Sequence, residues 1–254
     1  MALKEVGTIL SNEAIIENMI YKMEVQSGKI ASAILPGQFL QIKCAELPLL
    51  RKPISVFDCN KEKGTYSILY QIRGEGTRIL SKKKPLETLD VIGPLGTSFP
   101  LPKSNGDILL VGGGIGIAPL FLLGRILKMQ ELSFTFILGF STKIESYAIN
   151  LFKTLGPVQV ATMDGTLGAE GHVGSILESY DKSKIGTIYA CGPEPMAKYL
   201  QQYSQDSEVY LSLEAYMGCG VGACLSCVCK TKSQDYLRVC TEGPVVKSEE
   251  VDLS

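Results

Sequence analysis

Four cysteines near the carboxyl end of the chain have the spacing of metal ligands. Cys219, Cys224 and Cys227 are separated by four and then two residues, and Cys240 follows after twelve more. This spacing is typical of plant-type 2Fe–2S centres. Two glycines between the first two cysteines allow the loop to curl with positive φ and to direct backbone N–H groups toward a negatively charged cluster. We therefore predict a 2Fe–2S site with these four thiolates as ligands.

Other interpretations of the cysteines stay open at this point. A zinc site favours two Cys-x2-Cys pairs, and only Cys224 and Cys227 form one. A disulfide framework is expected of secreted chains, and the first residues lack the basic and apolar regions of a secretory signal. Cys229 follows Cys227 by two residues, so on an extended segment both point to the same side. We interpret Cys229 as a spare thiol, although it could replace Cys227 as the third ligand.

The composition excludes several classes of function. The 254 residues suffice for one to three compact units, and a net charge of −1 gives no basic surface for nucleic acid. The lone histidine, His172, excludes a Rieske centre and disfavours a His-based zinc hydrolase or a Ser–His triad. We expect His172 in a loop or on the surface. Eight cysteines without a signal peptide indicate a reducing, cytoplasmic compartment.

The first hundred residues have the pattern of an antiparallel β domain. Short runs alternate apolar and polar residues, and turn residues separate them; the clearest runs are Tyr21–Val25, Gln38–Lys43 and Thr65–Ile72. This pattern predicts a small β-barrel. Two stretches of this domain could bind a flavin nucleotide, Arg51–Val56 for the ring and Gly74–Leu80, which opens a helical run, for the pyrophosphate.

From Asp107 onward the pattern changes to α/β. Strands are expected at Ile108–Val111, Phe134–Phe140, Val158–Ala161 and Thr187–Cys191, and helices at 117–129, 144–155, 174–180 and 194–205. Alternating strands and helices predict a doubly wound parallel sheet. The uncharged segment from 108 to 124 is short for a membrane span and holds several glycines, so a buried strand, a glycine loop and a helix explain it better. We expect no membrane contact.

The glycine loop after the first of these strands does not match G-x-G-x-x-G, because Pro119 occupies the last position. A glycine loop at a helix N-terminus can still bind a pyrophosphate. Ligands of such sheets bind at the carboxyl ends of the strands. The candidates for a nicotinamide nucleotide are therefore Gly113, Gly114, Gly116 and Cys191.

Several motifs together resemble a known family. The barrel, the run Gly112–Pro119 and the run Cys191–Met196 resemble the ferredoxin–NADP reductase superfamily. With Leu50–Ser55, Ile68–Gln71, Gly93–Gly96 and Cys219–Cys224, almost the whole chain resembles the electron-transfer subunits of class 1B dihydroorotate dehydrogenases, which serve pyrimidine biosynthesis. The resemblance implies an FAD-binding barrel over residues 1–102, an NAD-binding α/β domain over 103–213 and a 2Fe–2S module over 214–254.

The resemblance also implies roles for particular residues. FAD would be lined by Lys52, Pro53, Ile54 and Ser55, flanked by Leu69, Tyr70 and Gln71, and held at its pyrophosphate by Gly76 and Thr77; Cys219, Cys224, Cys227 and Cys240 would hold the cluster. Lys52 stands where the superfamily usually has arginine. Lysine keeps the charge and lacks the bidentate fork, and the neighbouring Arg51 could compensate.

The resemblance implies an electron path without a general base. A partner subunit with FMN would oxidise dihydroorotate, and electrons would pass through the cluster and FAD to NAD⁺, in a heterotetramer of two plus two subunits. The absence of arginine between Gly139 and Asn150 favours NAD over NADP, although Lys143 lies in that loop. The alternatives are an electron-transfer subunit of a ferredoxin–NAD(P) oxidoreductase or a hydrogenase, and a zinc-stapled binding module.

Overall fold

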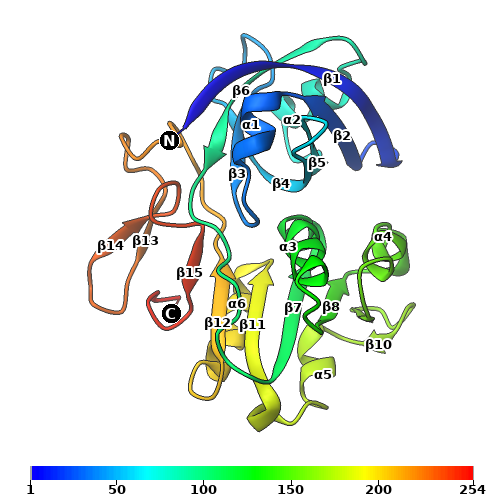
Figure 1. The fold of residues 1–254 in the computed structure, drawn as a ribbon, viewed down its shortest axis with the longest axis vertical. Coiled ribbons are helices and arrows are strands. Elements are labelled where there is room, and N and C mark those ends of the chain that lie inside the picture. The colour runs from blue at the N-terminus through cyan, green and yellow to red at the C-terminus, as the bar shows by residue number, and fades with distance from the viewer. Residues whose placement is uncertain (1, 254) are drawn as a thin grey trace.

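The computed structural model describes residues 2–253 and places an antiparallel barrel above a parallel sheet (Figure 1). The barrel is closed in the order β1-β2-β5-β4-β3-β6. Its strands are β1 (Leu3–Ile16), β2 (Ile20–Gln26), β3 (Phe39–Lys43), β4 (Lys52–Asn60), β5 (Thr65–Gln71) and β6 (Thr88–Leu95). Alternate apolar residues of these strands fill the barrel, as their period of two requires. The predicted barrel is confirmed.

Two short helices interrupt the barrel, α1 (Gly28–Ala33) and α2 (Glu75–Ser81). The sequence analysis predicted a helical run at Gly74–Leu80 and none at α1. The carboxylate of Glu5, on β1, accepts hydrogen bonds from the Ser27 hydroxyl and from the backbone N–H of Ile30. A side chain from a distant strand thus satisfies donors at the start of α1, and Ile30 is buried in the barrel core. No local sequence pattern predicts a contact between residues so far apart in the chain.

The second unit is a seven-stranded sheet in the order β10-β9-β8-β7-β11-β12-β15. Six of these strands are parallel: β7 (Asp107–Gly113), β8 (Thr135–Phe140), β9 (Val158–Thr162), β10 (Ala169–Glu170), β11 (Ile185–Cys191) and β12 (Glu208–Ser212). The order reverses between β7 and β11, which makes their carboxyl ends the switch point where such sheets bind ligands. Both the glycine loop and Cys191 lie there.

Helices cover both faces of this sheet, which confirms the doubly wound prediction. α3 (Ala118–Met129) and α4 (Ile149–Lys153) pack on one face, and α5 (Val173–Leu177) and α6 (Glu194–Leu200) pack on the other. α3 agrees with its prediction within one residue. The helix expected at 144–155 is wrong, because a 3-10 turn at Lys143–Glu145 and the separate helix α4 replace it. The helices expected at 174–180 and 194–205 are shorter than predicted; the second continues as a 3-10 turn over Gln201–Tyr203.

His172 lies just before α5, is exposed, and accepts a hydrogen bond from the N–H of Gly174 at 3.0 Å. Its predicted place on the surface is confirmed, and it serves as a helix cap.

The cysteine segment returns to the sheet at its end. β13 (Val228–Lys230) and β14 (Tyr236–Arg238) form a small hairpin beside the sheet, and β15 (Val245–Lys247) pairs antiparallel with β12 (Figure 1). The carboxyl-terminal segment thus supplies the edge strand of the nucleotide-domain sheet. The division into units of 1–102, 103–213 and 214–254 stays a prediction.

The barrel is fixed to the sheet through β4 and α3. The rings of Phe57 and Phe121 stack with centroids 4.4 Å apart. Arg125 Nη2 lies 2.8 Å from the Asp58 carboxylate and also donates to the carbonyl of Cys59. These contacts set the position of the barrel relative to the switch point of the sheet. Among residues 2–253, no helix has the length and apolar character needed to cross a membrane.

Candidate functional site

A pocket of about 520 Å³ lies between the barrel, the switch point of the sheet and the segment that leads to the cysteines. Its volume is in the range of small-molecule and cofactor sites. Nine predicted flavin residues line it: Lys52, Pro53, Ile54, Ser55, Leu69, Tyr70, Gln71, Gly76 and Thr77. Gly116 and Cys191, predicted for the nicotinamide nucleotide, line it as well. The structure thus brings the two predicted sets together, and their individual roles stay predictions.

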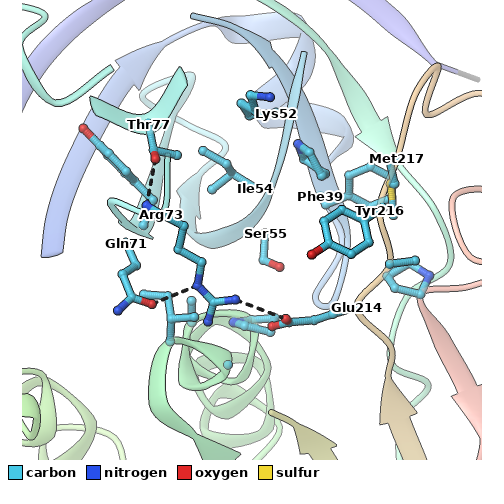
Figure 2. Close-up of a pocket in the computed structure, with 18 of the residues that line it drawn as sticks. Phe39, Lys52, Ile54, Ser55, Gln71, Arg73, Thr77, Glu214, Tyr216 and Met217 are labelled. Carbon is cyan, nitrogen blue, oxygen red and sulfur yellow. Dashed lines mark hydrogen bonds and ion pairs between the residues drawn. The ribbon is translucent and has the colours of Figure 1, made fainter. Parts of the chain in front are cut away.

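Lys52 and Gly76 lie side by side in one corner of this pocket, and Lys52 is labelled in Figure 2. A Cβ added to Gly76 would lie 2.5 Å from Cε of Lys52, so the glycine leaves room for the lysine stem against the first turn of α2. The ammonium group of Lys52 has no hydrogen-bond or ion-pair partner among the described residues. A free cation beside a glycine backbone is a suitable place for a phosphate group, so this corner fits the pyrophosphate of FAD.

Three other residues of the set serve mainly in folding. The Thr77 hydroxyl accepts hydrogen bonds from the N–H groups of Arg73 and Gly74 and donates to the Gly74 carbonyl at 3.1 Å. Ile54 and Tyr70 belong to the core of the barrel, and the Tyr70 hydroxyl donates to Asn12 at 2.9 Å. These polar groups are therefore already engaged. Ser55 and Gln71 also line the pocket, where Oε1 of Gln71 accepts a hydrogen bond from Nε of Arg73 at 3.0 Å (Figure 2).

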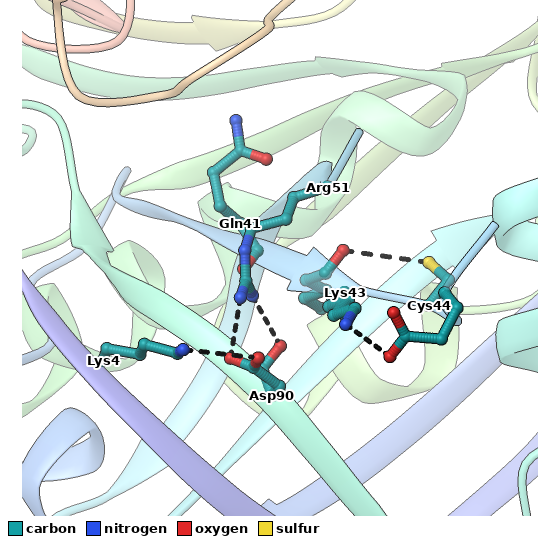
Figure 3. Close-up of polar contacts among 8 residues, drawn as sticks. Lys4, Gln41, Lys43, Cys44, Arg51 and Asp90 are labelled. Atoms are coloured by element: carbon teal, nitrogen blue, oxygen red, sulfur yellow. Dashed lines mark hydrogen bonds and ion pairs between the residues drawn. The ribbon is translucent and has the colours of Figure 1, made fainter. Parts of the chain in front are cut away.

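The guanidinium of Arg51 is hydrogen-bonded within the barrel, so its expected compensation for the lysine at position 52 stays a prediction. Its guanidinium donates to the carboxylate of Asp90 at 2.8 Å, to the Asp90 carbonyl at 2.9 Å and to the Gln41 carbonyl at 3.3 Å (Figure 3). The side chain is 17% exposed. Arg51 therefore fastens the start of β4 to β6, while it also lines the first pocket beside Lys52.

A second pocket of about 320 Å³ adjoins the first at the switch point. Gly113 and Gly114 line it, together with Ser141, Glu145 and Tyr147 from the end of β8 and the turn after it. Gly114 has φ of +55°, a conformation that favours glycine and lets the loop pass close to a ligand. This pocket fits the nicotinamide nucleotide, since it opens where β7 ends.

Cys191 ends β11 and lines the first pocket. It is 5% exposed, and burial raises its pKa to about 12. The thiol is therefore protonated at neutral pH, and it offers a small uncharged wall rather than a nucleophile.

The cysteine loop directs backbone donors at its first thiol. The N–H groups of Val221, Ala223 and Cys224 point at Sγ of Cys219 at 3.3–3.4 Å. The loop achieves this with positive φ at two glycines, +71° at Gly220 and +82° at Gly222. Several N–H groups around one sulfur favour its thiolate form and a bound anionic cluster. The predicted loop geometry is present.

The four predicted ligands form two pairs. Cys219 and Cys224 exchange backbone N–H to sulfur contacts at 3.4 Å. Burial raises the pKa of Cys240 to about 11, and the neighbouring thiol of Cys227 contributes to that shift. No group of three or more His, Cys, Asp or Glu among residues 2–253 is arranged to hold a single metal ion. Two thiolates per iron is what a two-iron cluster requires, so the residues fit the 2Fe–2S group.

Cys229 lies apart from this set. Its thiol donates to the Lys230 carbonyl at 3.6 Å, and its pKa is raised by burial and by the carboxylates of Asp252 and Glu194. Cys229 packs against the same core cluster as Cys227 and Cys240, with its thiol hydrogen-bonded to a backbone carbonyl. This placement supports the interpretation of Cys229 as a spare thiol. All eight cysteines are free, so no disulfide framework exists.

Several residues that line the pockets were not predicted from the sequence, and four of them bear on the chemistry of these pockets. Arg73 and Glu214 line both pockets, and their charged groups lie 3.9 Å apart across the entrance (Figure 2). Tyr216 and Met217 line the first pocket, and Tyr216 is 97% exposed. Arg73 could have been predicted from its position, because it directly follows the strand that was expected to flank the flavin. No signal placed the residues before Cys219 against the barrel.

The chain was compared with known proteins. Residues 214–252 match the family described as the iron–sulfur cluster binding domain of dihydroorotate dehydrogenase B. The electron transfer subunit of dihydroorotate dehydrogenase B (NAD(+)) from Bacillus pumilus is 42% identical over 253 residues, with 97% of each chain covered. The corresponding subunit from a Geobacillus species is 40% identical, with 100% of each chain covered. The chain belongs to this family of electron transfer subunits.

Solved structures agree with this assignment. A structure of the NADH-dependent reduced ferredoxin–NADP oxidoreductase is similar with a TM-score of 0.87 at 29% identity, covering 98% of this chain and 90% of that one. A ferredoxin reductase of carbazole 1,9a-dioxygenase has a TM-score of 0.69 at 19% identity and shows the common fold alone. The predicted superfamily, with its FAD, 2Fe–2S cluster and NAD, is therefore confirmed for the family.

Proposed function

We propose that the chain carries electrons from an FMN-containing catalytic subunit, which oxidises dihydroorotate to orotate, through its 2Fe–2S cluster and FAD to NAD⁺. When bound, FAD can exchange a hydride with a nicotinamide and single electrons with a cluster. The observation that carries the proposal is the shared segment from Glu214 to Met217. This segment is a wall of the flavin pocket and leads directly into the cysteine loop, so the two sites adjoin.

The outer face of the cysteine loop supports the docking of a partner. Cys224 is exposed, and the next residue, Leu225, lines a shallow surface pocket together with Val228 and Tyr236, all three with 43–67% exposure. Exposed apolar groups gathered at one place favour a protein contact. A catalytic subunit docked on this face would bring its flavin near the cluster. We propose a cytoplasmic complex of two subunits of each kind. Light scattering of the co-expressed proteins would test this stoichiometry.

The acidic groups of the second pocket support NAD over NADP. Glu145 and Glu214 both line it, and the Glu145 carboxylate accepts a hydrogen bond from the Ser141 N–H at 3.3 Å. Arg73 also lines the pocket and pairs with Glu214 at 3.9 Å, which leaves Glu145 as the carboxylate to which a free ribose hydroxyl could donate and which would repel a 2′-phosphate. Lys143 is exposed and does not line this pocket.

The proposal is tested with the purified chain and its co-expressed partner under anaerobic conditions. We expect flavin and iron–sulfur bands in the visible spectrum that bleach with NADH, and dihydroorotate-dependent reduction of NAD⁺ by the complex. A Cys224→Ala variant of the same complex is expected to lose this reduction and to keep its flavin band. Bleaching by NADPH alone, with no response to dihydroorotate, would instead favour a ferredoxin–NAD(P) oxidoreductase.

A further inference from the structure

Gln41 is a fully buried polar residue between the two cofactor sites. It is 0% exposed and lies on β3 opposite Pro53 of the flavin-lining strand. Its neighbours Leu40 and Ile42 point into the barrel, so Gln41 points out of it, on the same side of β3 as Phe39. Phe39 packs in one cluster with Cys227 and Cys240. In Figure 3 its side chain extends away from the Arg51–Asp90 pair.

The carboxamide of Gln41 has few partners of its own. Nε2 donates to the sulfur of Met217 at 3.9 Å, which is a weak hydrogen bond. Oε1 has no hydrogen-bond partner among the described residues. A buried amide with an unpaired atom is unfavourable, and native proteins rarely keep one without a ligand or a function.

The same carboxamide contacts the cysteine loop. A Cβ added to Gly220 would lie 2.5 Å from Nε2 and 2.6 Å from Cγ of Gln41. Gly220 follows Cys219 directly, and its φ of +71° belongs to the turn that directs the N–H donors at that thiol. Gln41 is therefore the side chain on which this turn rests, and its other contact, Met217, is a wall of the flavin pocket.

We propose that Gln41 is a positioning residue for electron transfer: its carboxamide hydrogen-bonds the assembled cluster loop and raises the reduction potential of the 2Fe–2S cluster. The inference rests on the proposed electron path. Hydrogen-bond donors and dipoles near the sulfurs stabilise the reduced cluster, which is the more negative form. The amide nitrogen and oxygen can exchange places by a half-turn, so either side of the group can supply a donor.

The test is a redox titration of the loaded full-length chain, followed by visible absorbance and by the electron paramagnetic resonance of the reduced cluster. Gln41→Leu removes the amide and keeps an apolar side chain of similar reach. We expect the ratio of reduced cluster to reduced FAD to fall three- to tenfold. A tenfold fall corresponds to a cluster potential about 59 mV lower for a one-electron carrier. Gln41→Glu is expected to shift the potential the same way, because a carboxylate adds negative charge and no donor.

Gln38→Leu is the matched control. Gln38 also lies beside β3, but its amide is fully used, donating to the Gly96 carbonyl and accepting from the Leu35 N–H, both at 2.9 Å. Its loss is expected to lower stability and to leave the cluster potential unchanged. Loaded Gln41→Leu with the wild-type potential would overturn the proposal. If Gln41→Leu fails to load, Gln41→Glu decides in the same way. A wild-type chain without flavin and iron–sulfur bands would overturn the proposed function as well.

Discussion

Two thiols show how burial and hydrogen bonding separate residues of one type. Cys224 is exposed, and the hydroxyl of Ser226 together with backbone N–H groups lowers its pKa to about 6. Cys191 is buried, and desolvation raises its pKa to about 12. Thiolates react with alkylating agents and bind metals, and thiols do so far more slowly. The first is suited to a cluster ligand and the second to an inert pocket wall.

Alkylation tests this difference directly. In the cluster-free chain at pH 7, iodoacetamide is expected to modify Cys224 within minutes and to leave Cys191 unmodified, because only Cys224 is both exposed and ionised. Peptide mass spectrometry gives the extent at each site. Modification of all eight cysteines after unfolding in guanidinium chloride is the control. Equal labelling of the two thiols in the folded chain would contradict the assigned environments.

Lys52 carries the second prediction at this scale. Lys52→Met keeps the stem over Gly76 and removes the charge that faces the pocket. The loss of one charge-assisted contact to phosphate is expected to weaken FAD binding about tenfold, or about 1.4 kcal/mol. Fluorescence quenching of FAD on binding to the flavin-free chain measures it. Lys52→Arg should bind nearly as tightly as the wild-type chain, and equal affinity for all three proteins would exclude a phosphate contact.

At the scale of elements, the pairing of β4 with α3 decides where the barrel sits. Asp58 and Arg125 are each about one-third exposed, and the Phe57–Phe121 stack lies beside them. Burial raises the pKa of Asp58, and Arg125 opposes that shift. An ionised Asp58 without Arg125 would be a poorly solvated, unpaired charge, so this ion pair matters more than the exposed pairs elsewhere.

Arg125→Met is therefore expected to destabilise the chain by about 1–2 kcal/mol at pH 7. The folded pKa of Asp58 rises further without Arg125, so its ionised form opposes folding. The destabilisation is expected to shrink as the pH falls and Asp58 becomes protonated in the folded chain. Thermal unfolding at pH 7 and pH 4.5 measures both effects. Arg78→Met, which removes an exposed pair with Glu75 at 4.0 Å, should change little at either pH.

At the scale of the whole molecule, the cysteine segment is tied to the other two units by more than a cluster. β15 pairs with β12. The Thr97 hydroxyl, after the barrel, donates to the Val245 carbonyl at 2.8 Å and accepts from its N–H at 3.0 Å. Residues 214–217 and Pro244 line the flavin pocket. The flavin site therefore depends on the segment itself, and the cluster adds stability to one loop of it.

This arrangement predicts that cluster loss and segment loss differ. Cys240→Ser should abolish the iron–sulfur bands and keep FAD, because β15 and residues 214–217 stay in place. A chain ending at residue 213 should lose FAD, because one wall of the pocket and the edge strand are gone. Flavin and iron content of the two purified proteins tests this. Loss of FAD from Cys240→Ser would show that the cluster itself holds the pocket together.

The fold class could be predicted from the sequence because it rests on local patterns, and the four proposed cluster ligands come from a local pattern as well. The strand alternation and the helical run after the glycine loop are each visible within a short stretch of sequence. The Cys-x4-Cys-x2-Cys spacing also spans only nine residues. The helix limits were less certain. The helix expected at 144–155 is split because residues between Ser146 and Ala148 turn before α4 begins.

Contacts between distant segments were decided only by the tertiary structure. Glu5 caps α1, Arg51 pairs with Asp90, and Gln41 lies against Gly220. Each pair joins residues whose separation along the chain ranges from 25 to 179 positions. A side chain's role there depends on which strand closes the barrel beside it and on where β15 joins the sheet. The sequence by itself determined which groups could do the chemistry, and the packing of the barrel against the sheet determined which of them meet.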